Sequence, residues 1–377
     1  MSIKKFSYSE FESTPQFWEF QPSEFSQVNL IVGQNSTGKS RLINVISSFC
    51  NVLNGHQTKA YVSGTYNVEL LLEEKTYELC LEFSNGVVKK ETLEVDGERL
   101  LTRHEDGSGS IKYEKENKNI EFQVHTNAIV IQQRQDDLQH PFITAISRWA
   151  RGAQVLRFGS SFGQDRLVGL MSLEQEIAQQ DFSFDYGDIT SVYSKGFTKF
   201  GEPLDKAIIR DMAELGYELI DVGSTDLRNH LPGLKMPEPM IGMFVQEKDR
   251  NALLPQTQMS QGMFRALALV IYINIAVFSQ KKTLMLIDDI GEGLDYERST
   301  NLLTLLMNHA QSADLQLAMT SNDRFVMNSV PLEYWCLLRR KGSTVKAYNI
   351  HNSKQAFADF KFMGLSNFDF FTSNTFE

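Results

Sequence analysis

The chain has 377 residues, of which 42% are hydrophobic and 22% charged, which is ordinary for a soluble globular protein of one elaborated domain or two. The net charge of −10 does not favour a broad basic surface, although it permits a local one. Cys50, Cys80 and Cys336 are far apart in apolar surroundings, so we expect reduced core residues and neither a disulfide framework nor a metal site. The start of the chain lacks the apolar stretch of a signal peptide, so we expect a cytoplasmic protein.

Short strands are expected at residues 3–8 and 17–20, before the most informative segment of the chain. The aromatic residues Phe11, Phe17 and Trp18 lie in this region. One of them could stack on a nucleotide base, or all of them could serve only for core or rim packing. The pattern leaves both possibilities open.

Residues 28–32 (VNLIV) predict a strand, and residues 33–40 (GQNSTGKS) follow it with the P-loop pattern GxxxxGK[ST]. The two glycines of this pattern let the backbone approach a ligand closely, and the N–H groups of the loop form a nest for phosphate oxygens. A helix over residues 39–50 begins with its positive end at the phosphates. The residues that we expect at the nucleotide are Gly33, Asn35, Ser36, Thr37, Gly38, Lys39, Ser40 and Arg41.

Two side chains of the loop carry specific chemistry. Lys39 is expected to reach the β- and γ-phosphates as a point charge. The hydroxyl of Ser40 is expected to ligate Mg²⁺. The loop therefore predicts a nucleotide–Mg²⁺ site.

The next segment, residues 59–132, alternates apolar and polar residues between Asn-Gly and Asp-Gly turns, which predicts an antiparallel meander with one solvated face. After it, helices are expected at residues 138–158, 173–180 and 204–215, and strands at 217–222 and 240–246. A Pro- and Gly-rich loop at residues 229–239 separates the last two strands.

Residues 259–278 open with a small polar turn and continue as a nearly all-apolar helix, which must be buried on most sides. Its apolar part is short for a membrane span and contains Arg265 and Asn274. Buried strands are expected at residues 283–287 and 315–320, with a helix between them at 296–309. A terminal hairpin and a Phe-rich tail follow, and the tail could pack on the body or contact a partner.

Acidic residues come directly after the first of these buried strands. Asp288 is placed to hold Mg²⁺ opposite Ser40, and Asp289 to act as the general base that orients the attacking water. An aspartate pair alone is weak evidence, but this pair lies downstream of a P-loop and a Ser-x-Gly turn. Its position therefore indicates the second half of an ATPase site.

The set of motifs resembles the ATP-binding cassette (ABC) ATPases. MSQGMFRALAL at residues 259–269 is similar to their signature motif, and LMLIDDIGEGLD at residues 284–295 is similar to their Walker B motif and D-loop. The chain resembles the SMC-like, RecF-like and OLD-like branch, many members of which serve in bacterial phage-defence modules beside a separate effector. The resemblance implies an α/β fold with a mainly parallel central sheet, an antiparallel β-subdomain and an inserted helical lobe.

The resemblance also implies roles for particular residues. Ser260 and Gly262 would cap the γ-phosphate of ATP bound by a second copy, so that a head-to-tail dimer closes around ATP. Arg265 would contact the catalytic site or form a surface or interface salt bridge, and Gln135 is a third candidate for the Q-loop residue that links Mg²⁺ to the lobe. The other residues with implied roles are Gln132 or Gln133 (Q-loop), Asp288 (Mg²⁺), Asp289 (base), Asp295 (D-loop) and Ser321 (switch position).

Two departures from the family pattern predict slow hydrolysis. Asp289 stands where the family usually has glutamate, and Ser321 stands where it usually has histidine. Each weakened interaction typically costs ~10²–10³ in rate, so we expect turnover well below about one ATP per second.

The sequence predicts three units: residues 1–137 (P-loop and β-arm), 138–250 (inserted lobe) and 251–377 (signature, Walker B, D-loop and tail). The favoured function is an ATP-dependent switch that controls an effector, a nuclease or toxin encoded nearby, without a membrane partner. The alternative is a RecF-like clamp that binds DNA through basic residues. The candidates for contacts with DNA are Arg148, Arg151, Arg157, Lys195 and Lys199.

Overall fold

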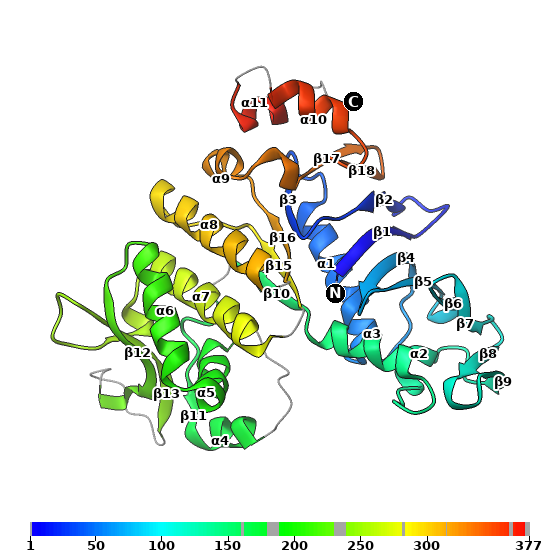
Figure 1. The fold of residues 1–377 in the computed structure, drawn as a ribbon, viewed down its shortest axis with the longest axis horizontal. Coiled ribbons are helices and arrows are strands. Elements are labelled where there is room, and N and C mark those ends of the chain that lie inside the picture. Colours follow the sequence, from blue (N-terminus) through cyan, green and yellow to red (C-terminus); the bar gives the residue numbers. More distant parts are fainter. Residues whose placement is uncertain are drawn as a thin grey trace.

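The computed structural model describes residues 2–159, 162–178, 188–229, 239–280, 283–313, 315–361 and 365–373. A 14-stranded sheet runs through it in the order β10-β15-β16-β3-β17-β18-β2-β1-β4-β5-β6-β7-β8-β9 (Figure 1). Five neighbouring strands at one end of this order pair in parallel. They are β10 (Gln154–Arg157), β15 (Leu284–Asp288), β16 (Gln316–Thr320), β3 (Val28–Val32) and β17 (Trp335–Lys341).

The rest of the large sheet is mostly antiparallel. β17 turns back into β18, β18 pairs with β2 in parallel, and antiparallel pairs then continue from β2 to β9. The sheet is therefore mixed, and parallel pairing dominates only around β3. The strands are β18 (Thr344–Tyr348), β2 (Trp18–Glu24), β1 (Ser2–Glu10), β4 (Ser63–Leu72), β5 (Lys75–Ser84), β6 (Val87–Val95), β7 (Glu98–Arg103), β8 (Ser108–Tyr113) and β9 (Lys118–Gln123).

The P-loop strand β3 is buried on both faces, which explains its unbroken apolar run. Val28, Leu30 and Val32 belong to the core formed with α7 (Gln261–Ser279) and α8 (Tyr296–Ser312). Ile31 belongs to the core formed with α1 (Lys39–Asn54) and α3 (Pro141–Arg151) on the opposite face. The central sheet is thus covered by helices on both sides.

One predicted helix is wrong in its second half. We expected a helix over residues 138–158, but α3 ends at Arg151 and residues 154–157 form β10, which pairs with β15. Gly152 follows the helix directly, and the apolar run after it is buried against the Walker B strand. Residues 141–157, which the predicted division placed in the inserted lobe, therefore lie in the main sheet and in the helix that packs on α1.

A separate lobe follows β10 in the chain (Figure 1). Its small sheet contains β11 (Val168–Gly169), β13 (Met240–Glu247) and β12 (Leu219–Asp226), and β14 (Leu254–Pro255) pairs with β13. Its helices are α4 (Leu170–Ala178), α5 (Ile189–Phe200) and α6 (Glu202–Glu214). The predicted helix 173–180 thus corresponds to α4, with residues 179 and 180 outside the described part. Of the predicted loop 229–239, residues 230–238 also lie outside it.

Helix α7 joins the lobe to the main sheet and is the one helix of the described residues long and apolar enough to cross a membrane. It is 78% buried inside the protein over its most apolar window, as the sequence pattern predicted for a core helix. Asn274, one of its polar residues, donates to Asp211 of α6 at 2.7 Å and is thereby satisfied.

The C-terminal region packs on the body along its described residues. Helices α10 (Lys354–Lys361) and α11 (Asn367–Thr372) place Phe357, Phe360 and Phe370 together, with Phe370 next to Trp335. Six short elements complete the helices of the described residues: α2 (Val130–Gln133), α9 (Arg324–Ser329) and the 3₁₀ turns η1 (Glu114–Glu116), η2 (Leu227–Asn229), η3 (Gln256–Gln258) and η4 (Leu332–Tyr334).

Candidate functional site

The P-loop connects β3 to α1 through a tight turn. A Cβ atom at Gly33 would lie 2.6 Å from the Thr37 hydroxyl oxygen, so only glycine fits there. Ser36 and Gly38 have φ values of 65° and 104°, the left-handed conformation that turns successive N–H groups toward the same side. Gly38 is the N-cap of α1, so the loop ends at the positive end of a 16-residue helix. This arrangement suits a polyphosphate.

Lys39 lies beneath the loop with only 6% of its surface exposed. Its ammonium group donates to the carbonyl oxygens of Gly33 at 2.7 Å and Gln34 at 3.2 Å. Burial lowers the pKa of Lys39, and the carboxylates of Asp289 and Asp288 oppose that shift. The lysine is therefore fixed at the loop by its own backbone and is available to a phosphate oxygen without a large rearrangement.

The structure brings the P-loop and the Walker B strand together. The Ser40 hydroxyl donates to Asp288 Oδ1 at 3.0 Å, and the Thr320 hydroxyl donates to the same oxygen at 2.6 Å. Thr320 Oγ1 also accepts the Asp289 N–H at 2.8 Å. The three neighbouring parallel strands β15, β16 and β3 end at this edge, which explains why residues so far apart in sequence meet here.

This group of oxygens fits Mg²⁺. A serine hydroxyl and a carboxylate oxygen within 3.0 Å of each other are hard donors of the kind that Mg²⁺ prefers, and the cation would replace the hydrogen bond between them. Asp289 follows Asp288 in the chain and has a backbone φ of 57°. Burial raises the pKa of Asp289, and repulsion from Asp288 and Glu292 adds to the shift. A divalent cation would relieve that repulsion.

Ser321 does not reach this group. Its side chain is 1% exposed, and its hydroxyl donates to the Ile290 carbonyl at 3.2 Å and accepts the Asp323 N–H at 3.1 Å. The preceding residue, Thr320, supplies the hydroxyl at the site instead. Because side chains alternate along a strand, a shift of one residue changes which of them faces the carboxylates. Sequence reasoning missed Thr320, although it is the last residue of the predicted strand.

One of the aromatic residues near the loop, Trp18, serves in packing. Trp18 is 1% exposed, and its ring lies 3.4 Å from the position of a Cβ atom on Gly38. The Arg41 guanidinium covers this ring at 4.4 Å from the centroid and forms an ion pair with Glu10 at 2.5 Å. Of the two possibilities left open by the sequence, the structure thus gives Trp18 a packing role under the P-loop.

The signature and D-loop residues meet each other within the chain. Ser260 is exposed and is the N-cap of α7, where its side chain accepts the Met263 N–H at 3.2 Å. A Cβ atom on Gly262 would lie 2.7 Å from the Gly293 carbonyl oxygen, so this glycine allows α7 to approach the D-loop. Asp295 caps α8 by accepting the Arg298 N–H at 2.9 Å and is exposed.

Arg265 joins these segments to the end of β10. Its side chain is 7% exposed and donates to the carbonyl oxygens of Glu292 at 3.0 Å and Gly159 at 3.1 Å. The sequence left open a contact with the catalytic site and a surface or interface salt bridge, and these two bonds link Arg265 to the backbone of its own chain. They fix the D-loop relative to the start of the signature helix.

The three glutamines proposed for the Q-loop lie elsewhere. Gln132 donates to the carbonyl oxygens of Val52 at 2.7 Å and Gln57 at 2.6 Å, at the end of α1 that is ~18 Å from Ser40 by helical rise. Gln133 is exposed on the same short helix, and Gln135 bonds to Arg151 of α3. The structure does not bring this segment to the Mg²⁺ ligands.

A different glutamine occupies the link between the Walker B strand and the signature turn. Gln164 follows β10, the neighbour of β15, and its side chain donates to the carbonyl oxygens of Gln256 at 2.9 Å and Met259 at 2.8 Å. The Gln256 side chain donates back to the Gln164 carbonyl at 2.9 Å. Because a helix was predicted over residues 138–158, the sequence predicted neither the strand β10 nor the position of Gln164 after it.

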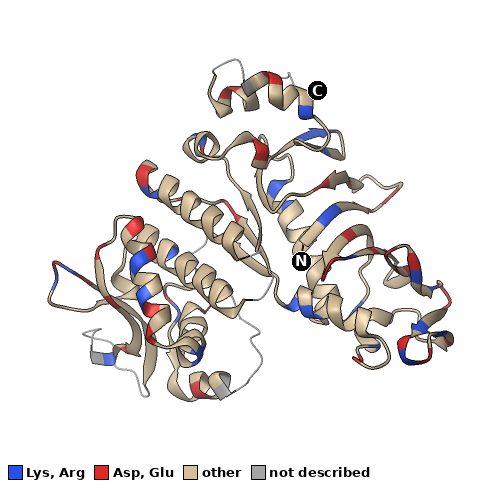
Figure 2. Cartoon of the chain, viewed as in Figure 1, with Lys and Arg blue, Asp and Glu red and all other residues tan. Residues whose placement is uncertain are grey.

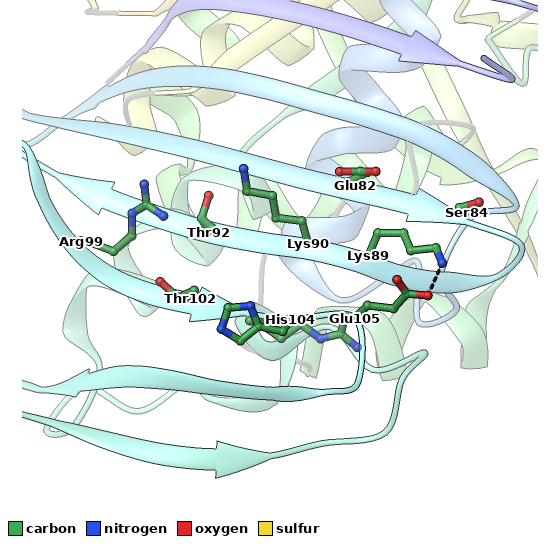
Figure 3. A pocket seen from close by; sticks show the side chains of 10 residues that line it. Glu82, Ser84, Lys89, Lys90, Thr92, Arg99, Thr102, His104 and Glu105 are labelled. Carbon is green, nitrogen blue, oxygen red and sulfur yellow. Dashed lines mark hydrogen bonds and ion pairs between the residues drawn. The ribbon is translucent and has the colours of Figure 1, made fainter. Parts of the chain in front are cut away.

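The basic residues considered for DNA come from two parts of the molecule. Arg148, Arg151 and Arg157 belong to α3 and β10, whereas Lys195 and Lys199 belong to α5 of the lobe. The charged residues of α3, β10 and α5 are all basic, and Figure 2 shows acidic residues on other elements of both parts of the molecule. One cavity lies on the β-arm (Figure 3). Its lining mixes lysines with glutamates, among them the Lys89–Glu105 ion pair.

Comparisons with known proteins establish the fold. No protein-family model matches the chain, and neither does any curated protein. The structure is similar to an SMC head bound to the C-winged helix domain of ScpA, with 13% identity, a TM-score of 0.56, and coverage of 92% of this chain and 97% of that one. It is also similar to an Smc head with an extended coiled coil bound to the C-terminal domain of ScpA, derived from Pyrococcus furiosus, with 12% identity, a TM-score of 0.52, and coverage of 95% and 99%. The SMC-head type of α/β fold is therefore confirmed.

Proposed function

We propose that this protein is a slow ATPase switch that binds ATP with Mg²⁺, closes head-to-tail into a homodimer, and controls a partner effector protein in a bacterial defence module. The observation that carries the proposal is the contact of Ser40, Asp288 and Thr320 below a P-loop that already holds Lys39. Asp288 and Thr320 end two neighbouring parallel strands, and Lys39 and Ser40 begin a helix. They meet at the carboxyl ends of the strands, which is where ligands bind in open α/β sheets.

Each residue has a defined part in the proposed reaction. Ser40 and Asp288 would hold Mg²⁺, which neutralises charge on the β- and γ-phosphates, and Lys39 would contact those phosphates. Asp289 would accept a proton from the attacking water. Its short side chain, and the absence of a histidine between Thr320 and Arg324, support slow turnover.

Dimer closure is supported by the exposed signature face. Ser260 and the N-terminus of the 19-residue helix α7 are open to solvent and offer a hydroxyl and a positive helix end. Arg265 and Gly262 hold this face against the D-loop, so it can act as one rigid surface on ATP bound by a second copy. The control of a partner draws support from the two similar SMC heads, each of which is bound to a domain of ScpA.

Hydrolysis and sedimentation together test the proposal. The wild-type protein should release phosphate at well below about one per second and should sediment as a dimer only with ATP and Mg²⁺. Asp289→Asn should retain ATP and stabilise the dimer, whereas Lys39→Ala should give neither dimer nor hydrolysis. Turnover as fast as that of typical enzymes, near ~10 s⁻¹, or an absence of ATP binding, would refute the switch.

Effector binding needs its own experiment. Co-purification of proteins encoded beside the gene, with wild-type and Lys39→Ala chains, should give an effector that is held only when ATP can bind. A partner held equally by both chains would contradict ATP control.

A RecF-like clamp on DNA is the second candidate, because the sequence IDDIGEGLDYER at residues 287–298 resembles that branch. Binding to gapped and linear duplex DNA, titrated with salt, separates the two functions. A clamp should bind at low salt and lose affinity steeply as salt rises, whereas no measurable affinity at low salt would remove this candidate.

A further inference from the structure

Two large aromatic side chains lie exposed and in contact beside the D-loop. Tyr296 is 59% exposed and Phe325 is 53% exposed. Their ring centroids are 5.1 Å apart at an interplanar angle of 66°, the edge-to-face arrangement that aromatic pairs favour. Among the large apolar side chains of the described residues that are this exposed, these two form a ring pair with each other. A rigid apolar pair in water is typical of a contact surface.

The backbone fixes the pair in place. Tyr296 is the first residue of α8, and Phe325 lies in the first turn of α9, where Asp323 accepts the N–H groups of both Phe325 and Val326. The hydroxyls of Thr300 in α8 and Ser329 in α9 hydrogen-bond at 3.1 Å, and a Cβ atom on Gly291 of the D-loop would lie only 2.8 Å from Val326 of α9. The rings are therefore ordered before any partner binds, which lowers the entropic cost of binding.

Helix α11 of the same chain also packs on α9. The Arg324 guanidinium lies 5.0 Å from the Phe368 ring centroid, and the Phe368 N–H donates to the Asn328 side chain at 2.9 Å. Helix α11 thus packs on α9, while Phe325 remains 53% exposed.

The ring pair continues the face that contains the signature and D-loop residues. Tyr296 follows Asp295 directly, and the exposed residues Glu292 and Gly293 precede it. Gly293 in turn contacts Gly262 at the start of α7, next to exposed Ser260. One surface therefore runs from the signature turn along the D-loop to the two rings.

Charge indicates which partner fits this surface. In the chain segments that contain the rings, the exposed carboxylates Glu292, Asp295, Glu297 and Asp323 outnumber the basic residues Arg298 and Arg324. The other side of the ATP site has exposed cations on the β17–β18 hairpin, Arg340 and Lys341, and Arg340 donates to the P-loop carbonyl of Ser36 at 3.2 Å. In a head-to-tail pair, the acidic surface of each copy faces the basic rim of the other, so the chain is complementary to itself.

We infer that Tyr296 and Phe325 form the apolar anchor of the interface between two copies of this chain and become buried when ATP closes the dimer. This inference rests on the proposed ATP-dependent dimer and adds the residues that hold it together. Preorganised tyrosine and phenylalanine next to polar groups have the character of binding hot spots.

The first test measures dimer affinity in the Asp289→Asn background, because this variant should hydrolyse too little ATP for the dimer to dissociate during the measurement. Tyr296→Ser combined with Phe325→Ser should raise the dimer Kd about tenfold or more by sedimentation velocity with ATP and Mg²⁺. The affinity of the monomer for a fluorescent ATP analogue should stay within about twofold, since neither ring contacts the P-loop. Ile220→Ser, which changes an apolar residue of the lobe that is also 53% exposed, should leave the Kd unchanged.

The outcomes separate the two proposals. If the Asp289→Asn protein stays monomeric with ATP, the proposed dimer fails and this inference with it. If that protein dimerises and the double variant dimerises equally well, the dimer stands and only the anchor is overturned. An equal loss of affinity in Ile220→Ser would also overturn the anchor, because the effect would not be specific to the ring pair.

The second test preserves an aromatic ring. The native tryptophans Trp18, Trp149 and Trp335 are 1–2% exposed, so Phe325→Trp introduces the side chain that acrylamide quenches most readily. Adding ATP and Mg²⁺ should lower the quenching constant severalfold, and the Lys39→Ala version should show no change. Unchanged quenching in a sample that sedimentation shows to be dimeric would overturn the inference.

Discussion

The two halves of the proposed ATP site differ in how far each is completed by its own chain. On the P-loop side, Lys39 is buried, and Ser40, Asp288 and Thr320 already share hydrogen bonds. On the signature side, Ser260 is exposed, and the internal contacts there, such as that of Gly262 with Gly293, fix the backbone and leave the functional hydroxyl toward solvent. The comparison teaches that one half is a preorganised pocket and the other a preorganised surface, which is what a site shared between two copies requires.

Lys39→Ala is expected to have the largest effect, because it removes the charge at the centre of the preorganised half. We expect kcat/KM for ATP to fall by at least ~10²–10³, through binding as well as turnover. Steady-state phosphate release and ATP titration measure the two effects. Melting curves serve as the control, since this lysine also bonds to two loop carbonyls. Hydrolysis within tenfold of wild type would show that ATP is held elsewhere.

Ser260→Arg separates the two halves most directly. The bulky cation at the exposed cap of α7 should block closure on a second copy, so hydrolysis should fall by ~10²-fold while ATP affinity stays within about threefold. The ratio of the two changes is the measurement. If affinity fell as much as hydrolysis, Ser260 would belong to the pocket of its own chain and the comparison would be wrong.

Thr320→Val tests the internal bonding of the P-loop half with a side chain of the same shape. The variant loses the hydroxyl that donates to Asp288 and accepts the Asp289 N–H. We expect a cost of about 1–3 kcal/mol in unfolding free energy and a decrease in hydrolysis of roughly tenfold. Urea unfolding and phosphate release give these values. Thr320→Ser keeps the hydroxyl and should stay near wild type in both assays.

Glu91 lies in the interior of the β-arm, outside both halves of the ATP site. Its expected effect, on the pH dependence of stability, is smaller than those above. Its carboxylate is fully buried and accepts the N–H groups of Val130 and Ile131 at 2.8 Å each, and burial raises its pKa to about 7. The folded state therefore binds this proton more tightly than the unfolded state. Its contribution to stability is present below about pH 4.5 and is lost as pH rises through about 7, by up to ~3 kcal/mol.

Urea unfolding at several pH values measures this contribution. Stability of the wild type should decrease between about pH 5 and pH 7, and Glu91→Gln should have a shallower pH dependence. A slope that is the same in both proteins would show that Glu91 has an ordinary pKa. ATP binding should be unaffected, since the arm lies outside the site.

The parts of the site that follow local sequence rules were predictable. The P-loop, the apolar strand before Asp288 and the cap at Ser260 each depend on a few consecutive residues, and the structure has them where the pattern indicated. Thr320 and Gln164 were missed for two reasons. The direction in which the Thr320 side chain points depends on strand register. The role of Gln164 depends on β10, a four-residue strand that pairs with β15, whose residues lie 131 positions further along the chain. Gln132 was misplaced because only the packing of the whole β-arm decides where its end lies.

The backbone at Asp289 restricts which residues can replace it. Its φ of 57° is a left-handed conformation that aspartate, asparagine and glycine tolerate better than longer or branched residues. A glutamate introduced there to imitate faster ABC ATPases would have to adopt this conformation or shift the turn at residues 289–292. Evolution toward a faster enzyme would therefore require coordinated changes in the turn, so the slow rate that we propose is a property of the local fold and not of one side chain.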